Sequence, residues 1–402
     1  MHDRPAPPPL EHLRDLVHAD PGLQRELTRL SNQALAERIL TLASDSGIAL
    51  RAEDIAPFLR PDPIGAAALT DWVPPRCGWP SPDWRPTGMV RLLDGSLAID
   101  WAHFAGERLA DPFYAQTARI ASARPFNRLF RYRSTLDDFI SGAATEALPD
   151  PDGLIFHMSR CGSTLVGQML AALPESIIVS EPPPLAVVAR LAASADDALA
   201  IRIVRAMAGA LGRGGGKPFV IKLDLSGAAF LPLYRQAFPS VPWLFLSRSP
   251  AEVLASQMRS RGPETQPHLA PELGADPDAP EEVQIAQSIA FACRAALDAS
   301  SDQCALFVDY GDLPEVVFTA ILPHFRIDPG DHRSAMAAAA LRDAKAPLRS
   351  FAPETAVPDS VAAATVRDAA EAYLAPLYAR LRALRSVHAR PQERPGSGRD
   401  AR

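Results

Sequence analysis

Residues 154–170 contain the feature that most constrains how this chain can fold. They read Leu-Ile-Phe-His-Met-Ser-Arg-Cys-Gly-Ser-Thr-Leu-Val-Gly-Gln-Met-Leu, which predicts a buried strand, a glycine turn and an amphipathic helix. Such a turn points free backbone N–H groups and the positive end of the helix dipole at one place. Arg160 adds a fork of donors, and Ser163 and Thr164 add hydroxyl groups beside Gly162. The sequence therefore predicts a phosphate site, but without the glycine–lysine pattern of nucleoside triphosphatases.

From residue 151 onward, strand-like and helix-like segments alternate. We expect strands at 154–158, 176–180, 218–223, 242–247 and 305–309. This alternation predicts an α/β fold in which helices cover a parallel sheet. Ligands of such sheets bind outside the carboxyl ends of the strands. The polar residues expected at those ends are Arg160, Glu181, Lys222, Asp224, Arg248 and Tyr310.

Arg248 and Ser256 predict a second anion site. Arg248 ends an expected strand, Pro250 suits the first turn of the next helix, and Ser256 follows Arg248 by eight residues. Taken alone, an arginine here would equally fit a surface ion pair, and the serine a solvated position. Together with the first turn, they indicate a ligand that carries two separated phosphates.

Composition excludes several classes of protein. The 402 residues carry a net charge of −6, which argues against a general nucleic-acid binder. No apolar run approaches the roughly 18–20 residues that span a bilayer, and the start has no signal-peptide pattern, so we expect a cytoplasmic protein. The four cysteines show no zinc-site or disulfide spacing. Cys161 is interpreted as a small side chain that fits the turn, and a nucleophilic thiol is the alternative.

The pattern along the chain predicts four parts. Residues 1–60 form a small helical domain, in which Asp20 and Pro21 begin the second helix and Gly47 ends the third. Residues 61–150 form a Pro/Trp-rich connector, a hairpin that turns at Asp94-Gly95, and helices that pack on the core. The α/β domain spans 151–385, with expected helices that include 185–211 and one near 360–385, and a disordered tail spans 386–402.

Three motifs in this order and spacing resemble those of the sulfotransferases that use 3′-phosphoadenosine 5′-phosphosulfate (PAPS). Residues 159–165 resemble the 5′-phosphosulfate loop of that family, and residues 246–250 with Ser256 resemble its 3′-phosphate motif. Residues 308–313, Val-Asp-Tyr-Gly-Asp-Leu, resemble a later motif that usually reads Tyr-Glu-Asp-Leu. The resemblance implies a P-loop-type sulfotransferase fold, PAPS as the donor cosubstrate and no metal.

The match is most similar to the tyrosylprotein branch, which has arginine in place of lysine in the first loop. That branch places a catalytic glutamate shortly after the first helix, and Glu181 falls at this spacing. Its Lys-Asp-Pro motif is matched only as Lys222-Leu223-Asp224. By this resemblance Arg160 and Lys222 stabilise the leaving phosphate, and Glu181 accepts the proton of the acceptor hydroxyl. The donor-binding residues would be Arg160, Cys161, Gly162, Ser163, Thr164, Arg248, Ser256 and Tyr310.

Three of these roles have alternatives. Asp224 is the rival base, because other branches place a histidine base two residues after the corresponding lysine, and it could equally cap a helix or pair with Lys222. Glu181 could merely cap its proline-rich turn. Tyr310 could contact the adenine or ribose, or it could be a core aromatic residue.

Residues 10–59 resemble the small nitrogen-fixation-associated (Nif11-type) helical domain that also serves as a leader in natural-product precursor peptides. The resemblance implies a peptide or protein acceptor, plausibly a tyrosine, which this domain would help to recruit. A bundle that only covers apolar surface is the alternative. Two other functions stay open: a P-loop kinase that uses ATP and magnesium, for which Asp309 would be a metal ligand, and a non-catalytic scaffold.

Overall fold

The computed structural model describes residues 8–60, 73–193, 195–342 and 361–388. Contacts divide the chain into two units, one of Met1–Asp150 with Pro182–Lys217 and one of Pro151–Glu181 with Pro218–Arg402. The first segment ends where the sequence predicted the second part to end. The four predicted parts themselves stay predictions, and residues 61–72 of the predicted connector lie outside the described residues.

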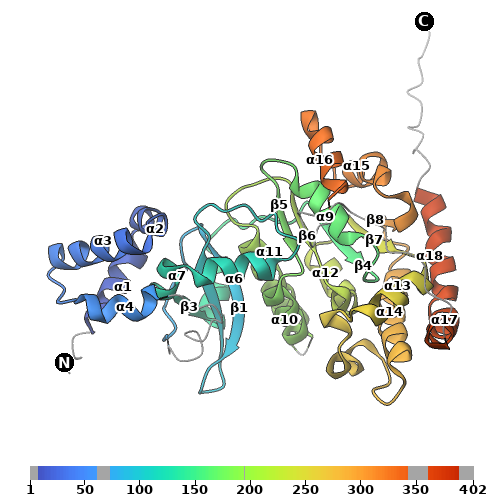
Figure 1. Cartoon of the computed structure of the whole chain (residues 1–402), viewed down its shortest axis with the longest axis horizontal. Coiled ribbons are helices and arrows are strands. Elements are labelled where there is room, and N and C mark those ends of the chain that lie inside the picture. The colour runs from blue at the N-terminus through green and yellow to red at the C-terminus, as the bar shows by residue number, and fades with distance from the viewer. Residues whose placement is uncertain (1–7, 61–72, 194, 343–360, 389–402) are drawn as a thin grey trace, which may run out of the picture. The chain divides into compact units, whose positions relative to one another are not determined.

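The second unit contains a five-stranded sheet in the order β5-β6-β4-β7-β8, and every pair of neighbours is parallel (Figure 1). Its strands are β4 (Gly153–His157), β5 (Ile177–Ser180), β6 (Phe219–Lys222), β7 (Trp243–Ser247) and β8 (Ala305–Asp309). All five predicted strands are present, and the predicted α/β fold with a parallel sheet is confirmed. Each strand is buried along its whole length, as expected of a sheet with helices on both faces.

The order of the strands fixes which helices lie on opposite faces. From β4 the chain passes over β6 to reach β5, whereas from β7 it moves the other way to β8. Because such crossovers are right-handed, α9 (Ser163–Ala171) covers one face, and α13 (Pro250–Arg259) and α14 (Glu281–Asp298) cover the other. The chain direction thus reverses beside β4, and ligands of open α/β sheets bind at such a point.

Short helices complete the second unit. The remaining α-helices of its described part are α12 (Leu231–Ala237), α15 (Leu322–His324), α16 (Arg333–Ala340), α17 (Val361–Tyr373) and α18 (Ala375–His388), and the 3-10 and π turns are η1 (Leu225–Phe230), η2 (Pro263–Thr265), η3 (Pro267–Leu269), η4 (Pro271–Leu273), η5 (Tyr310–Asp312), η6 (Val317–Ile321) and η7 (Gly330–His332). α16 packs on α9, while α17 and α18 pack on α14. The helix expected near 360–385 is therefore two helices. Residues 386–388, where the sequence predicted the disordered tail to begin, are the last turn of α18, and residues 389–402 lie outside the described residues.

The first unit combines helices with a three-stranded antiparallel sheet, β1 (Trp84–Arg91), β2 (Leu97–His103) and β3 (Tyr132–Thr135). Its helices are α1 (Pro9–Ala19), α2 (Pro21–Thr28), α3 (Asn32–Asp45), α4 (Ala52–Leu59), α6 (Tyr114–Ala123), α7 (Pro125–Leu129), α8 (Leu136–Ala143), α10 (Pro183–Ala192) and α11 (Asp197–Leu211). The predicted hairpin forms, and Gly95 adopts φ 86° in its turn. The prediction of a single helix at 185–211 is wrong. The chain forms two helices there, α10 and α11, because the Asp196 side chain accepts from Leu199 N and begins a new helix.

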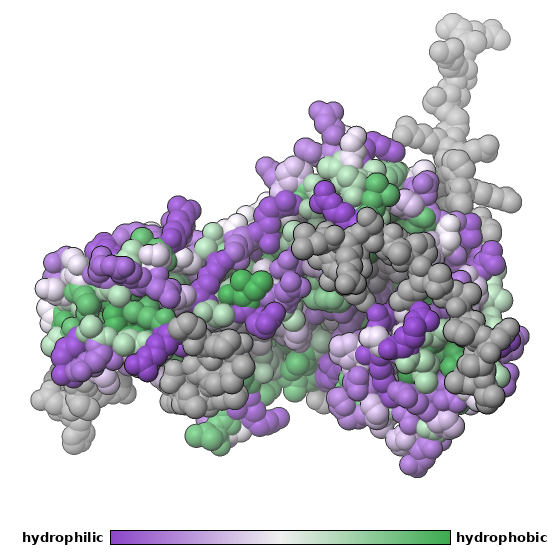
Figure 2. Space-filling model, in the orientation of Figure 1, coloured by the Kyte–Doolittle hydropathy of each residue, from purple (hydrophilic) through white to green (hydrophobic). Residues whose placement is uncertain are grey.

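The N-terminal helices begin and end as their sequence predicts. The carboxylate of Asp20 accepts from the N–H groups of Gly22 and Leu23, so it caps α2, and Gly47 adopts φ 68° after α3. Figure 2 shows apolar residues gathered in the band between α3 and the pair α1 and α4. The buried apolar side chains of these helices include Leu13, Val17, Leu23, Leu27, Leu35, Ile39 and Ile55.

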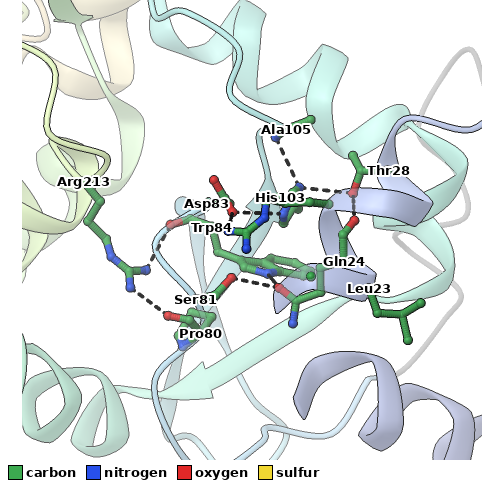
Figure 3. Close-up of polar contacts among 12 residues, drawn as sticks. Leu23, Gln24, Thr28, Pro80, Ser81, Asp83, Trp84, His103, Ala105 and Arg213 are labelled. Carbon is green, nitrogen blue, oxygen red and sulfur yellow. Dashed lines mark hydrogen bonds and ion pairs between the residues drawn. The ribbon is translucent and has the colours of Figure 1, made fainter. Parts of the chain in front are cut away.

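These helices also share buried polar contacts with the rest of their unit (Figure 3). Gln24 of α2 is 1% exposed, and its amide donates to the carbonyls of Val17 and His18. Its oxygen accepts from Trp84 Nε1 at 2.9 Å and from Ser81 Oγ at 2.8 Å. One side chain therefore joins α1, α2 and the beginning of β1.

Replacing Gln24 with leucine is expected to lower the free energy of unfolding by about 2–4 kcal/mol, because the buried Trp84 N–H loses its acceptor. Urea unfolding followed by tryptophan fluorescence measures the change. Gln33→Leu is the matched control, since Gln33 is exposed on α3 and its amide donates to Glu37 on the same helix. Equal stability of the two variants would contradict the importance of this contact.

Candidate functional site

The turn between β4 and α9 has an unusual backbone. Ser159, Arg160 and Gly162 have φ values of 63°, 49° and 87°. A left-handed conformation costs a non-glycine residue on the order of 1 kcal/mol or more, and such strain concentrates at functional sites. No described side chain caps the N-terminus of α9. The first amide groups of this helix therefore point toward a place where an anion would be stabilised.

Side chains from the α13 region hold this turn in place. Ser159 Oγ donates to Glu264 Oε1 at 2.8 Å and accepts from Gln257 Nε2 at 2.9 Å. Gln257 Oε1 in turn accepts from the N–H of Gly262 at 2.7 Å. The Arg160 guanidinium donates to the carbonyl of Ser260. The strained turn is thus fixed by a network that includes three side chains the sequence did not single out, Ser159, Gln257 and Glu264.

Glu181 and Lys222 form an ion pair at the ends of two neighbouring strands. Ser180 of β5 pairs with Lys222 of β6, and the N–H of Glu181 donates to the carbonyl of Lys222. The Lys222 side chain is fully buried, and its ammonium donates to Glu181 Oε1. The Glu181 side chain is 21% exposed. The pair therefore leaves one carboxylate partly open to solvent beside a cation that is enclosed by protein.

The charge state of Glu181 follows from its neighbours. Burial on its own would raise the pKa of Glu181, but the attraction of Lys222 and the contact with His157 lower it to about 2. This carboxyl group is thus ionised at neutral pH. The pKa difference makes the pair a source of stability, because the folded state holds the charged form more tightly than the unfolded state does.

His157 is a fully buried residue at the end of β4 that the sequence did not single out as a site residue. Its Nδ1 accepts from Ser159 N at 3.0 Å, and its Nε2 lies 3.7 Å from Glu181 Oε1. Burial lowers the pKa of His157, but the Cys161 and Glu181 side chains raise it more. The Nε2 atom faces the Glu181 carboxylate, whose negative charge favours a proton on that nitrogen. His157 thus links the strained turn to the carboxylate.

Asp224 has a structural role next to the same strand. Its Oδ1 accepts from Ser226 Oγ at 2.7 Å and from the N–H of Gly227 at 2.9 Å, so it caps η1. Burial raises the pKa of Asp224, and the nearby carboxylates of Glu181 and Glu264 raise it further. Asp224 therefore caps a helix, which is one of the alternatives that the sequence left open, and it uses one of its two carboxylate oxygens to do so.

Arg248 connects the second predicted anion site to the first. It follows β7, and its Nη1 donates to the carbonyl of Arg160 at 3.1 Å. Its Nε pairs with Glu252 at 2.7 Å, and its guanidinium carbon lies 4.3 Å from the centre of the Tyr310 ring. The turn after β4 and the end of β7 thus meet at one edge of the sheet, as parallel strand ends should.

Tyr310 also packs directly against the turn. A Cβ atom placed on Gly162 would lie 2.6 Å from Leu313 Cδ1 and 2.9 Å from Tyr310 Cδ2. Only glycine suits this position, because the φ is positive and the space is already filled. Tyr310 therefore contacts both the Gly162 turn and Arg248.

Replacing Gly162 with alanine is expected to weaken anion binding at this turn at least tenfold, and to destabilise the fold by about 1–3 kcal/mol, because the added methyl group displaces Tyr310 and Leu313. Gly215→Ala is a matched control, since Gly215 also has a positive φ, 77°, but a Cβ there meets nothing within 4 Å. Thermal unfolding with and without adenosine 3′,5′-bisphosphate measures both effects. Equal losses in the two variants would show that backbone strain alone is responsible.

The remaining predicted residues take positions along α9 and α13. Ser163 and Thr164 begin α9, with Ser163 buried and Thr164 half-buried. Cys161 is completely buried in the turn, which fits a space-filling side chain better than an accessible nucleophile. Ser256 is buried on α13. Among the described residues, no group of His, Cys, Asp and Glu is arranged to hold a metal ion, and none of their helices is both long and apolar enough to cross a bilayer.

Comparison with known proteins gives similarity to solved structures alone. No protein-family model matches this chain, and no curated protein matches it. Among solved structures, the sulfotransferase domain from the Synechococcus PCC 7002 olefin synthase aligns over 61% of this chain and 97% of that domain, with 18% identity and a TM-score of 0.35. A similarity at that TM-score carries no argument about function. The assignment that follows therefore depends on the residues of the site.

Proposed function

We propose that this protein is a sulfotransferase that moves a sulfuryl group from PAPS to an acceptor hydroxyl. The observation that carries the proposal is that the guanidinium of Arg248, from the second predicted anion site, contacts the backbone of the turn that forms the first. Arg248 donates to the carbonyl of Arg160, and Tyr310 packs against both Arg248 and Gly162. A ligand held by both sites needs two separated anionic ends, and PAPS has a 5′-phosphosulfate and a 3′-phosphate.

The residues at this edge fit such a donor. The open N-terminus of α9, Arg160 and the hydroxyl groups of Ser163 and Thr164 would hold the 5′-phosphate. Arg248 and Ser256 would hold the 3′-phosphate, and the Tyr310 ring would lie beside the nucleoside. Burial favours these contacts, because charge-assisted hydrogen bonds are stronger where water is excluded. Cys161 would shape the turn without touching the reacting atoms.

The reaction forms one S–O bond and breaks another. The acceptor oxygen attacks sulfur in line with the bridging oxygen of the 5′-phosphosulfate, and the electrons of the broken S–O bond remain on the leaving phosphate. Lys222 and Arg160 would stabilise that developing negative charge. The acceptor proton would pass to a carboxylate. Transfer therefore needs a base and a cation side by side, as Glu181 and Lys222 are.

Glu181 is the better candidate for the base. The ion pair with Lys222 holds Glu181 next to the cation that would contact the leaving group, and its side chain is partly exposed. Asp224 instead uses Oδ1 to cap η1. On binding, the donor phosphate would compete with Glu181 for Lys222. Loss of that cation, together with the added negative charge, would raise the pKa of Glu181 and make it a stronger base.

For the acceptor we propose a tyrosine of a peptide or protein, with the helices α1–α4 contributing to its recruitment. Because Gln24 joins these helices to Trp84, deleting them would expose the core of their unit. Substitutions on the exposed face of α3, such as Glu37→Lys, test recruitment without that damage. If these helices recruit the acceptor, KM for a peptide should change while turnover of a small phenol stays constant.

Ligand binding separates the proposed function from its alternatives. Adenosine 3′,5′-bisphosphate should raise the melting temperature without magnesium, and labelled sulfate from PAPS should appear on members of a panel of peptides, phenols and sugars. Stabilisation by ATP with magnesium instead would indicate a kinase. Binding of the bisphosphate without transfer to any acceptor class would favour a scaffold, and no response to either nucleotide would refute the proposed donor.

A further inference from the structure

The last described helix, α18, holds the segment that follows β8. The Tyr378 hydroxyl donates to Asp309 Oδ2 at 2.8 Å. About two turns further along the same helix, Arg385 forms an ion pair with Asp312 Oδ1 at 2.6 Å. α18 itself is fixed by packing against β8, α14 and α17. Two side chains of one helix thus hold both ends of η5.

The Asp309 carboxylate is buried, and each of its oxygens has a donor. Oδ1 accepts from the N–H of Gly311 at 3.0 Å, which caps η5, while Oδ2 accepts from Tyr378. Burial, followed by the bond to Asp309 and its negative charge, raises the pKa of Tyr378, so the hydroxyl group stays protonated and remains a donor. Removing this hydroxyl would leave a buried carboxylate oxygen without that donor, which favours a rearranged loop.

The segment that α18 holds is the one that joins the two anion sites. Its Tyr310 ring lies 4.3 Å from the guanidinium carbon of Arg248. The same ring and Leu313 leave no room for a side chain at Gly162. A small shift of η5 would change chiefly the stacking of the Tyr310 ring on Arg248, because the turn at Gly162 is also held by the bonds of Ser159 to Gln257 and Glu264. Contacts therefore run without interruption from Tyr378 through Asp309 and Tyr310 to Arg248.

We propose that Tyr378 is a positioning residue for the donor site, which acts through Asp309 and Tyr310 to orient Arg248 toward the 3′-phosphate. The donor part of this inference rests on the proposed function. The residues of α18 belong to none of the motifs found in the sequence. By this inference, α18 controls how well the site distinguishes nucleotides with a 3′-phosphate from those without one. Sulfuryl transfer itself would depend little on Tyr378, because Lys222 and Glu181 lie at other strand ends.

Tyr378→Phe tests the inference, since it removes only the hydroxyl group. Tyr373→Phe is the matched control, because Tyr373 is an exposed tyrosine of the adjacent helix α17. Isothermal titration should show adenosine 3′,5′-bisphosphate binding Tyr378→Phe about fivefold to tenfold more weakly than wild type, with the affinity for adenosine 5′-monophosphate changed less than twofold. In turnover, KM for the donor should rise similarly while kcat stays within about twofold. A purely structural role would weaken both nucleotides alike, and that result would overturn the inference.

Amide hydrogen exchange tests the positioning independently of any nucleotide. Peptides that cover residues 309–313 should exchange faster in Tyr378→Phe than in wild type or Tyr373→Phe, while β4 and β7 are unchanged. Unchanged exchange at 309–313 would refute the positioning role even if the protein binds the bisphosphate. A wild-type protein that does not bind the bisphosphate would refute the proposed donor. The exchange result would then still decide whether Tyr378 holds residues 309–313 in place.

Discussion

Replacing Glu181 with glutamine is expected to lower kcat for the proposed sulfuryl transfer by about a thousandfold, because the acceptor hydroxyl would lose the group proposed to take its proton. The substitution keeps the shape of the side chain and removes its charge. Since Lys222 is then no longer neutralised by a carboxylate, adenosine 3′,5′-bisphosphate should bind at least as tightly as it binds wild type. Labelled-sulfate transfer measures kcat, and titration calorimetry measures the affinity for the bisphosphate. A fall in kcat without a fall in affinity distinguishes loss of the base from damage to the donor site.

Asp224→Asn is the control that decides between the two carboxylates. The asparagine oxygen can still accept from Ser226 and from the N–H of Gly227, so η1 should remain capped. We expect kcat to stay within about threefold of wild type. A large loss in Asp224→Asn with normal turnover in Glu181→Gln would assign the base to Asp224 and correct the mechanism proposed above.

The strand ends could be predicted from the sequence because each depends on local pattern. A buried apolar run followed by a polar residue determines where a parallel strand stops, and parallel strands end at one edge of their sheet. This places Arg160, Glu181, Lys222, Arg248 and Tyr310 at the same edge without further information. The functional roles of these residues stay predictions, which the variants above are designed to test.

The contacts that fix the site could not be predicted, because they join residues distant in sequence. Glu264 reaches Ser159 across 105 positions, Gln257 reaches it across 98, and Tyr378 reaches Asp309 across 69. Nothing in the composition around them marks a partner, since each lies in an ordinary helical or turn segment. Only His157 carried a local signal, as a polar side chain at the end of an otherwise apolar strand just before a strained turn.

The contact between α2 and β1 also could not be predicted from local sequence. The periodicity of residues 10–59 predicted short helices, and Asp20 and Gly47 marked their boundaries correctly. Helical periodicity identifies an apolar face but not the surface it packs against. The bond between Gln24 and Trp84 shows that part of that surface belongs to the region which the sequence interpreted as a connector.

Replacing Lys222 with methionine is expected to abolish measurable transfer and to lower the free energy of unfolding by about 3–5 kcal/mol, because Glu181 is left in a buried site without its cation. Transfer fails because the leaving phosphate loses a stabilising charge. Lys217→Met is the matched control, since Lys217 is exposed in the loop before β6. Urea unfolding at pH 7 measures the loss, which should be within about 0.5 kcal/mol for the control.

The double variant Glu181→Gln/Lys222→Met tests whether that loss comes from the unpaired charge. With both charges removed, we expect most of the stability to return while transfer stays abolished.

The pH dependence of stability gives a second check. In wild type the folded-state pKa of Glu181, about 2, lies below its ordinary value of 4.5, so the stability that this carboxylate contributes is complete above about pH 4.5 and is lost as pH falls toward 2. In Lys222→Met burial should raise the pKa of Glu181, so the difference in stability from wild type should narrow as the pH falls from 7 to 3. A difference that stays constant over this range, or a double variant as unstable as Lys222→Met, would show that Lys222 stabilises the fold by packing instead of by charge.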